Sequence, residues 1–153
     1  MDNTSTSNYT MLCDFYELTM GNGYFESGLK DRITYFDLFY RNVPDNGGFA
    51  VAAGLEQVVE YIENLHFGEE DIAYLRSRGQ FTEAFLDYLR GFKFTGDIWA
   101  VPEGTPVFPR EPILTVRAPA IEAQLIETYL LLQINHQSLI ATKANRIVRA
   151  AEG

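Results

Sequence analysis

APAIEAQLIETYLLLQINHQSLIATKANRIVRAAEG, residues 118–153, is the stretch around which the rest of the chain is organised. It contains no glycine before Gly153, and Pro119 stands where proline is favoured, at the start of a helix. Its apolar residues recur at steps of three and four, which is the period of one helical face. They are Ile121, Leu125, Tyr129 and Leu132 in the first half, and Ile140, Ala144, Ile147 and Ala151 in the second. The pattern predicts one long helical segment.

The two halves of this segment differ in character. The first half is apolar almost all round, so we expect it to be buried. The residues that widen its apolar face are Ile126, Leu130, Leu131 and Ile134. The second half carries a basic stripe of Lys143, Arg146 and Arg149 in a chain whose net charge is −9. Such a stripe is typical of an anion site or of a solvated face, and spacing alone favours the solvated face.

Composition limits the class of protein. A chain of 153 residues with 46% apolar residues is long enough for one domain with a core. Its acidic balance argues against a nucleic-acid binder. A single cysteine, Cys13, excludes an internal disulfide framework and fits a reducing cytosol. The polar first ten residues do not resemble a secretory signal, and no apolar run approaches the ~20 residues that span a bilayer. We expect a cytoplasmic protein without nucleic-acid or membrane partners.

The segment LCDFYELTM, residues 12–20, has helical spacing of its apolar residues. Leu12, Phe15, Leu18 and Met20 are predicted to share one buried face, with Gly21 and Gly23 loosening or ending the helix. Asp14 and Tyr16 then lie beside that face or away from it. From composition alone, an aromatic residue in such a helix is more often part of the core than a ligand contact.

The middle of the chain reads as a strand, a loop, a second strand and three helices. RITYFDLFY (32–40) and FAVAAG (49–54) have strand composition, and helices are predicted over 54–65, 68–76 and 82–90. Arg41 follows the first strand and precedes a turn-rich loop, where an arginine can bind phosphate or carboxylate. An ordinary surface charge fits Arg41 equally well. His66 has no partner at metal-ligand spacing, so we expect a linker residue.

The sequence pattern changes over residues 92–119, where short alternating runs are broken by glycines and prolines. This pattern predicts three or four short strands in a small antiparallel sheet or half-barrel. Glu103 and Glu111 flank prolines in this region, and we interpret them as turn acids rather than a catalytic pair. Helices with antiparallel strands indicate an α+β fold. The final helix needs more partner surface than the preceding chain offers, so we expect a fragment or an obligate assembly.

Four of these segments, taken in order, resemble the nicotinate phosphoribosyltransferase family of type II phosphoribosyltransferases. They are LCDFYELTM (12–20), FDLFYRNVPDNGGFAVAAGLE (36–56), FTGDIWAVPEGTPVFPREPILTV (94–116) and IETYLLLQINHQSLIATKANRI (126–147). The resemblance implies NAD salvage: the ring nitrogen of nicotinate attacks C1 of phosphoribosyl pyrophosphate, and pyrophosphate and nicotinate mononucleotide are formed. It also implies Mg²⁺ and coupled ATP hydrolysis, although we expect this chain alone to bind neither.

The resemblance also implies roles for individual residues. Tyr16 matches the tyrosine that stacks on the pyridine ring from the neighbouring subunit of a head-to-tail homodimer. Asp14 would orient that segment or meet the edge of the substrate, and Arg41 would reach a phosphate across the same boundary. Lys143 and Arg146 would face phosphate or the partner subunit, or else form structural ion pairs. The resemblance assigns no catalytic residue and no metal ligand in this chain, and it gives His136, within the fourth segment, no catalytic role.

The resemblance covers only the N-terminal portion of the family. It implies a flexible start (1–11), an N-terminal α+β domain (12–134) and a helical lead-in (135–153) to an α/β barrel that is absent here. We therefore expect the chain alone to be inactive and to supply one wall of an active site. Two alternatives stay open: a truncated non-catalytic dimerisation or ligand-binding module, and a purely structural domain.

Overall fold

The structure is a computed structural model that describes residues 8–43 and 46–151. In chain order its elements are α1 (Phe15–Glu26), β1 (Ile33–Phe39), β2 (Ala50–Val51), α2 (Leu55–Asn64), α3 (Glu69–Ser77), α4 (Glu83–Arg90), β3 (Asp97–Ala100), β4 (Pro106–Val107), β5 (Pro112–Pro119), α5 (Ala120–Leu125) and α6 (Glu127–Ala151). Helices pack on antiparallel strands, so the predicted α+β class is confirmed. The described residues form no closed barrel.

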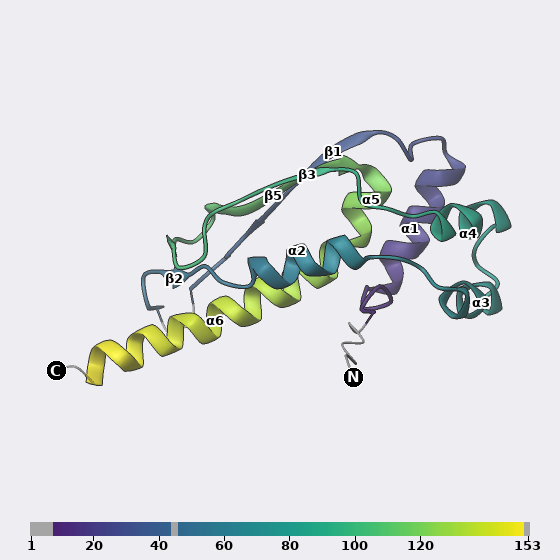
Figure 1. Cartoon of the computed structure of the whole chain (residues 1–153). Coiled ribbons are helices and arrows are strands. Elements are labelled where there is room, and N and C mark those ends of the chain that lie inside the picture. Colours follow the sequence, from purple (N-terminus) through teal and green to yellow (C-terminus); the bar gives the residue numbers. More distant parts are fainter. Residues whose placement is uncertain (1–7, 44–45, 152–153) are drawn as a thin grey trace.

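The strands form two antiparallel sheets. One has the order β1-β5-β3, and β2 pairs with β4 in the other. The strands predicted over 92–119 are present, and two of them pair with strands from the first third of the chain. In Figure 1 the strands lie along one side of the molecule, α6 runs along the other, and α1, α3 and α4 gather at the end away from the C-terminus.

Hydroxyl groups of α6 hold β2 in place. The Val51 N–H donates to Thr142 Oγ1 at 2.8 Å, and the Ala53 N–H donates to Ser138 Oγ at 3.0 Å. Both hydroxyl-bearing residues are buried, so these bonds satisfy backbone N–H groups that water does not reach. The Ser138–Thr142 part of the long helical stretch therefore has a structural use.

Glu103 closes the N-terminal end of α2. Its Oε1 accepts the N–H groups of Gly54 and Leu55, each at 2.7 Å. Gly54 has φ +104°, a conformation that favours glycine, and a carboxylate at a helix N-terminus is also favoured by the helix dipole. Glu103 therefore has a structural use as the cap of α2.

The prediction for residues 12–20 was wrong in its buried face and in its end. The helix α1 begins at Phe15 and continues through both glycines to Glu26. Leu18 is buried, but Leu12, Phe15 and Met20 are exposed. The helix instead packs through Glu17, Leu18 and Gly21, because Gly21 lets it approach the ring of Phe85: a Cβ at Gly21 would lie 3.3 Å from Phe85 Cζ.

The prediction of one continuous helix after Pro119 also needs correction. The segment is interrupted at Ile126, between α5 and α6. The Thr128 N–H, close behind this interruption, bonds to the Glu17 carboxylate at 3.1 Å. The first half is buried as expected at Ile121, Leu125, Ile126, Tyr129, Leu130 and Ile134, but Leu131 and Leu132 are exposed, so it is not covered all round.

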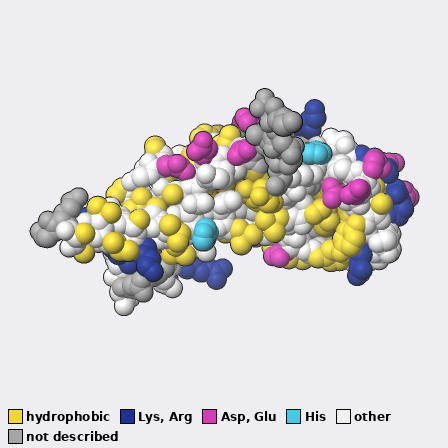
Figure 2. Space-filling view, turned by 60° about the horizontal axis from the view of Figure 1, so that its bottom comes forward, with side chains coloured by type: hydrophobic (Ala, Val, Ile, Leu, Met, Phe, Trp, Pro, Cys, Tyr) yellow, Lys and Arg dark blue, Asp and Glu magenta, His cyan; other side chains and the backbone are white. Residues whose placement is uncertain are grey.

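The second half of the long stretch keeps its apolar face uncovered. Ile140, Ile147 and Val148 are each more than half exposed, and in Figure 2 hydrophobic side chains gather at the end of the molecule where α6 terminates. Tyr35 and Trp99, on β1 and β3, are exposed to a similar degree. These surfaces agree with the expectation that the last helix needs more partner surface than the described residues provide.

Candidate functional site

The start of α1 lies against the start of α6. Asp14, the N-cap residue of α1, donates its backbone N–H to Thr128 Oγ1 at 3.2 Å. Tyr16, two residues further on, keeps 45% of its surface exposed. The aromatic residue singled out from the sequence is therefore not a core residue, and its ring is open to a ligand.

Glu17 follows Tyr16 and is fully buried. Its Oε1 accepts two hydrogen bonds from Thr128, one from the backbone N–H at 3.1 Å and one from the hydroxyl at 2.6 Å. Its Oε2 has no partner among the described residues. Burial raises the pKa of the Glu17 carboxyl to about 7; the bonds from Thr128 act in the opposite direction, and the charges of Glu127 and Asp14 add to the rise.

Glu127 completes the polar groups around Tyr16. Gln124 Nε2 donates to Glu127 Oε2 at 3.0 Å. Desolvation, followed by the charge of Glu127 and its hydrogen bond with the phenol, raises the pKa of Tyr16 to about 12. The phenol is therefore neutral at neutral pH, and any negative character of this junction comes from the carboxyl groups of Glu127, Glu17 and Asp14 around it.

Cys13 lies at the same junction and provides a prediction about reactivity. Burial, followed by the charges of Glu17 and Asp14, raises the pKa of its thiol to about 12. Because the thiolate is the reacting species, iodoacetamide should alkylate Cys13 at pH 8 more than about a hundredfold more slowly in the folded chain than in urea. Mass spectrometry of quenched samples gives both rates, and equal rates would show that the thiol is open and ordinary.

A groove between β1 and α6 leads from this junction towards Arg41. A cavity of about 100 Å³ is lined by Asp37, Leu38, Glu127 and Leu131, among others. A second cavity of about 190 Å³ shares Leu38 and Leu131 with the first and is lined also by Arg41. Glu127, which bonds with Tyr16, therefore lines one of two adjoining cavities and Arg41 lines the other, whereas Tyr16 itself lines neither.

Arg41 is exposed and follows a firmly held residue. The Tyr40 hydroxyl donates to the Asn135 carbonyl at 3.2 Å, and the Arg110 N–H donates to the Tyr40 carbonyl at 2.7 Å. Tyr40 is itself buried, so β1 ends at a fixed point on α6. The side chain of Arg41 extends from this fixed backbone position, and it is exposed, so an anion can reach its guanidinium.

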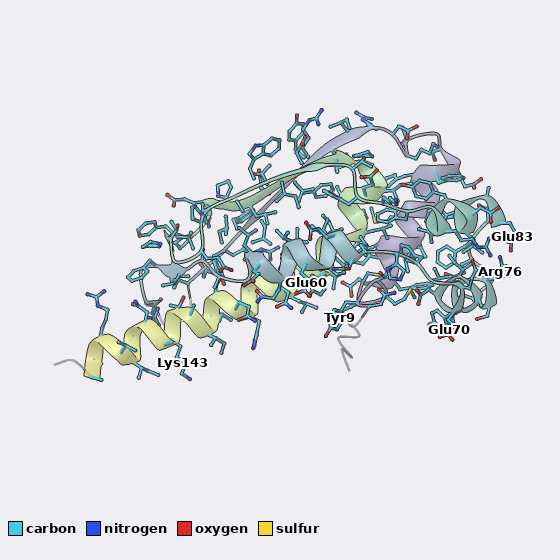
Figure 3. All side chains as sticks on the ribbon, in the orientation of Figure 1. Tyr9, Glu60, Glu70, Arg76, Glu83 and Lys143 are labelled. Carbon is cyan, nitrogen blue, oxygen red and sulfur yellow. The ribbon has the colours of Figure 1, made fainter. Side chains whose placement is uncertain are left out.

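Lys143 and Arg146 lie in a different part of the molecule. Lys143 is exposed on the side of α6 that faces away from the strands (Figure 3). The Arg146 side chain covers Gly47, where an added methyl group would overlap the guanidinium. Lys143 comes fifteen residues after Thr128, so the two lie about 23 Å apart along the helix. One copy of the chain does not bring this basic pair to Tyr16.

Sequence reasoning missed Glu17, Glu127 and Thr128 as parts of the site. All three lie inside quoted segments, but a polar residue beside an apolar helical face ordinarily points to solvent. Glu17 and Thr128 are separated by 111 positions, and neither pattern nor spacing links them. The weak signal was the paired polar residues Glu127 and Thr128 within an otherwise apolar run.

Solved structures define the class of this fold. The crystal structure of human nicotinic acid phosphoribosyltransferase matches 87% of this chain and 27% of its own, with a TM-score of 0.81 and 36% identity. The nicotinate-nucleotide pyrophosphorylase of Pyrococcus furiosus shares the fold, with a TM-score of 0.71 over 99% of this chain, 33% of its own chain and 22% identity. The fold is that of the N-terminal region of a phosphoribosyltransferase.

Sequence comparison identifies the family. The family described as nicotinate phosphoribosyltransferase (NAPRTase) N-terminal domain matches residues 11–135, and this chain belongs to it. Nicotinate phosphoribosyltransferase pncB2 of Mycobacterium tuberculosis is 47% identical over 94% of this chain, and the Bacillus subtilis nicotinate phosphoribosyltransferase is 47% identical over 88%. The chain spans 31% and 27% of the length of these two relatives. Among the described residues, no helix has the length and apolar character needed to cross a bilayer.

Proposed function

We propose that this chain is the N-terminal part of a nicotinate phosphoribosyltransferase that acts in NAD salvage. The complete enzyme would convert nicotinate, phosphoribosyl pyrophosphate and ATP to nicotinate mononucleotide, pyrophosphate, ADP and phosphate. The observation that carries this proposal is the match of residues 11–135 to the family, supported by relatives of that name at 47% identity. Residues 12–134 would be the domain, and residues 135–153 would begin the lead-in to a barrel.

Within that reaction the chain would supply one wall of the site. The exposed ring of Tyr16 offers a flat face on which a pyridine ring can stack. When the ring nitrogen forms its bond to C1 and the bond from C1 to pyrophosphate breaks, the pyridine ring gains positive charge. The acidic groups of Asp14 and Glu127 beside Tyr16 favour that charge. Asp14, held by its backbone to Thr128, would also orient this segment.

The remaining candidate residues are proposed to act on anions. Arg41 would bind a phosphate group at the far end of the groove, since it is exposed and attached to a fixed point. Lys143 and Arg146 are too far from Tyr16 in one copy, which favours a role at the boundary of a homodimer that shares its sites. Arg146 also contacts the loop at Gly47, so a structural role for it stays open.

The family resemblance implies Mg²⁺ and ATP. Among the residues that the structure describes, no three His, Cys, Asp or Glu side chains come together in a way that could hold a metal ion. The described residues therefore offer no cage of three such ligands, and we propose that the metal and ATP bind elsewhere in the complete enzyme. A cytoplasmic location likewise stays a prediction.

The test is a chimera in which this chain replaces the aligned segment of the M. tuberculosis relative. The chimera should form nicotinate mononucleotide from nicotinate and phosphoribosyl pyrophosphate. Tyr16→Ala should raise its KM for nicotinate about tenfold or more, because loss of a stacked ring and its contact area is worth about 1.4 kcal/mol. Steady-state kinetics measure this change. Tyr74→Ala, at another half-exposed tyrosine, should leave KM unchanged.

Two results would contradict the proposal. An unchanged KM in Tyr16→Ala would remove Tyr16 from the ligand contacts. A folded chimera that forms no product, together with nicotinate binding by the 153-residue chain that Tyr16→Ala abolishes, would favour the non-catalytic binding module instead.

A further inference from the structure

One hydroxyl group bonds to residues on both sides of Tyr16, to the backbone of Asp14 and to the side chain of Glu17. Thr128 Oγ1 accepts the Asp14 N–H at 3.2 Å and lies 2.6 Å from Glu17 Oε1. Asp14 precedes Tyr16 by two residues, and Glu17 follows it directly. The first turn of α1, which carries Tyr16, is therefore attached to α6 at two points by the same side chain.

The direction of the Thr128 hydroxyl follows from its chemistry. A hydroxyl group has one proton to donate and lone pairs that accept. Glu17 Oε1 takes the proton, so the lone pairs are left for the Asp14 N–H. Because Glu17 is fully buried and its Oε1 also accepts the Thr128 N–H at 3.1 Å, water does not compete for this arrangement.

The beginning of helix α1 lacks the side-chain cap that an N-cap residue ordinarily supplies. Asp14 is the N-cap residue, but its side chain makes no cap hydrogen bond. The orphan N–H groups of a first turn otherwise allow that turn to fray. The bonds through Thr128 thus hold the backbone at the start of α1, while the phenol of Tyr16 itself bonds with Glu127.

We propose that Thr128, with its hydroxyl directed by Glu17, is a positioning residue that sets the place of the Tyr16 ring for the pyridine substrate. The inference rests on the proposed function, in which Tyr16 contacts nicotinate. It adds that binding there depends on a side chain of α6 that does not touch the ligand.

The positioning itself is tested without ligand in the 153-residue chain. Thr128→Val keeps the shape of the side chain and removes the hydroxyl, whereas Thr128→Ser restores it. By NMR, the valine variant should shift the Tyr16 ring signals and speed amide exchange at Asp14 at least tenfold; the serine variant should resemble the parent. Thr142→Val is the matched control: it removes another α6 hydroxyl that accepts a backbone N–H, here from Val51, and should leave Tyr16 unchanged.

The consequence for binding is tested in the chimera. Thr128→Val should raise KM for nicotinate about fivefold, with kcat and KM for phosphoribosyl pyrophosphate within twofold of the parent. Thr128→Ser and Thr142→Val should match the parent. A merely structural threonine would change the melting temperature without this selective change in KM.

The outcomes separate this inference from the proposed function. If Tyr16→Ala raises KM but Thr128→Val changes neither Tyr16 nor KM, the positioning role is overturned and the proposed function stands. If Tyr16→Ala itself has no effect, the proposed function fails at that residue while the NMR arm still decides the positioning. If the valine variant does not fold, amide exchange at Asp14 is measured in the parent chain instead. An Asp14 amide that exchanges as fast as in an unfolded chain overturns the inference.

Discussion

Replacing Phe85 with alanine is expected to lower the free energy of unfolding by about 4 kcal/mol, as removal of a buried aromatic side chain from a core ordinarily does. Phe85 is fully buried, and its ring centroid lies 5.8 Å from that of Phe25 and 5.9 Å from that of Phe81. Its edge also fills the space above Gly21. The substitution therefore opens a cavity where α1 and α4 meet.

The consequence is large because a domain of this size has only about 5–15 kcal/mol of stability in total. Urea unfolding followed by circular dichroism gives the change. Phe108→Ala, at a residue that is 48% exposed, is the control and should stay within about 1 kcal/mol of the parent. Equal effects of the two substitutions would show that the aromatic cluster around Phe85 is not the centre of the core.

Much of the fold could be predicted from local chemistry. Helix α4 begins after Thr82, whose hydroxyl accepts the Phe85 N–H at 3.3 Å, and Gly91 follows its last residue, as the sequence indicated. Strand β1 coincides with the alternating run at 32–40. Such elements carry their signals within ten residues. The prediction of the buried face of α1 failed because that face is defined by contacts between residues far apart in sequence. These contacts join Glu17 to Thr128 and Gly21 to Phe85.

The candidate site was less accessible to sequence reasoning than the fold. Periodicity placed Tyr16 beside the apolar face or away from it, composition favoured a core aromatic, and only the family resemblance singled it out as a ligand contact. The structure adds that its ring is exposed, but no local rule predicts a buried glutamate at the next position. Glu17 would ordinarily avoid the interior, and it is tolerated there because Thr128 supplies two hydrogen bonds. The site therefore depends on a pairing that sequence spacing does not show.

Glu17→Gln is expected to change how stability depends on pH. Burial raises the pKa of Glu17 from its ordinary value of 4.5 to about 7 in the folded chain. Below about pH 4.5 the carboxyl is protonated in both states, so its burial carries no charge penalty. As pH rises through 7, the unfolded chain has already released this proton, and the folded chain must bury a charge or keep the proton. Stability therefore falls across this window.

The size of the fall follows from the pKa difference. One pKa unit corresponds to about 1.4 kcal/mol, so the contribution of Glu17 to the free energy of unfolding should drop by about 2–3 kcal/mol between pH 5 and pH 8. Glutamine keeps an oxygen that accepts from Thr128 and cannot ionise. The variant should therefore gain about 2–3 kcal/mol relative to the parent over the same interval. Urea titrations at each pH measure the difference, in which the other titrating groups cancel.

Glu56→Gln provides the matched control, because Glu56 is an exposed glutamate on α2 and should show no such pH-dependent gain. Burial and the neighbouring charges of Glu127 and Asp14 all disfavour the ionised Glu17, and none of them acts on a neutral glutamine in this way. If the gap between Glu17→Gln and the parent stayed constant from pH 5 to pH 8, Glu17 would ionise at its ordinary pKa. Its carboxylate would then be solvated, and the buried junction between α1 and α6 would be open to water.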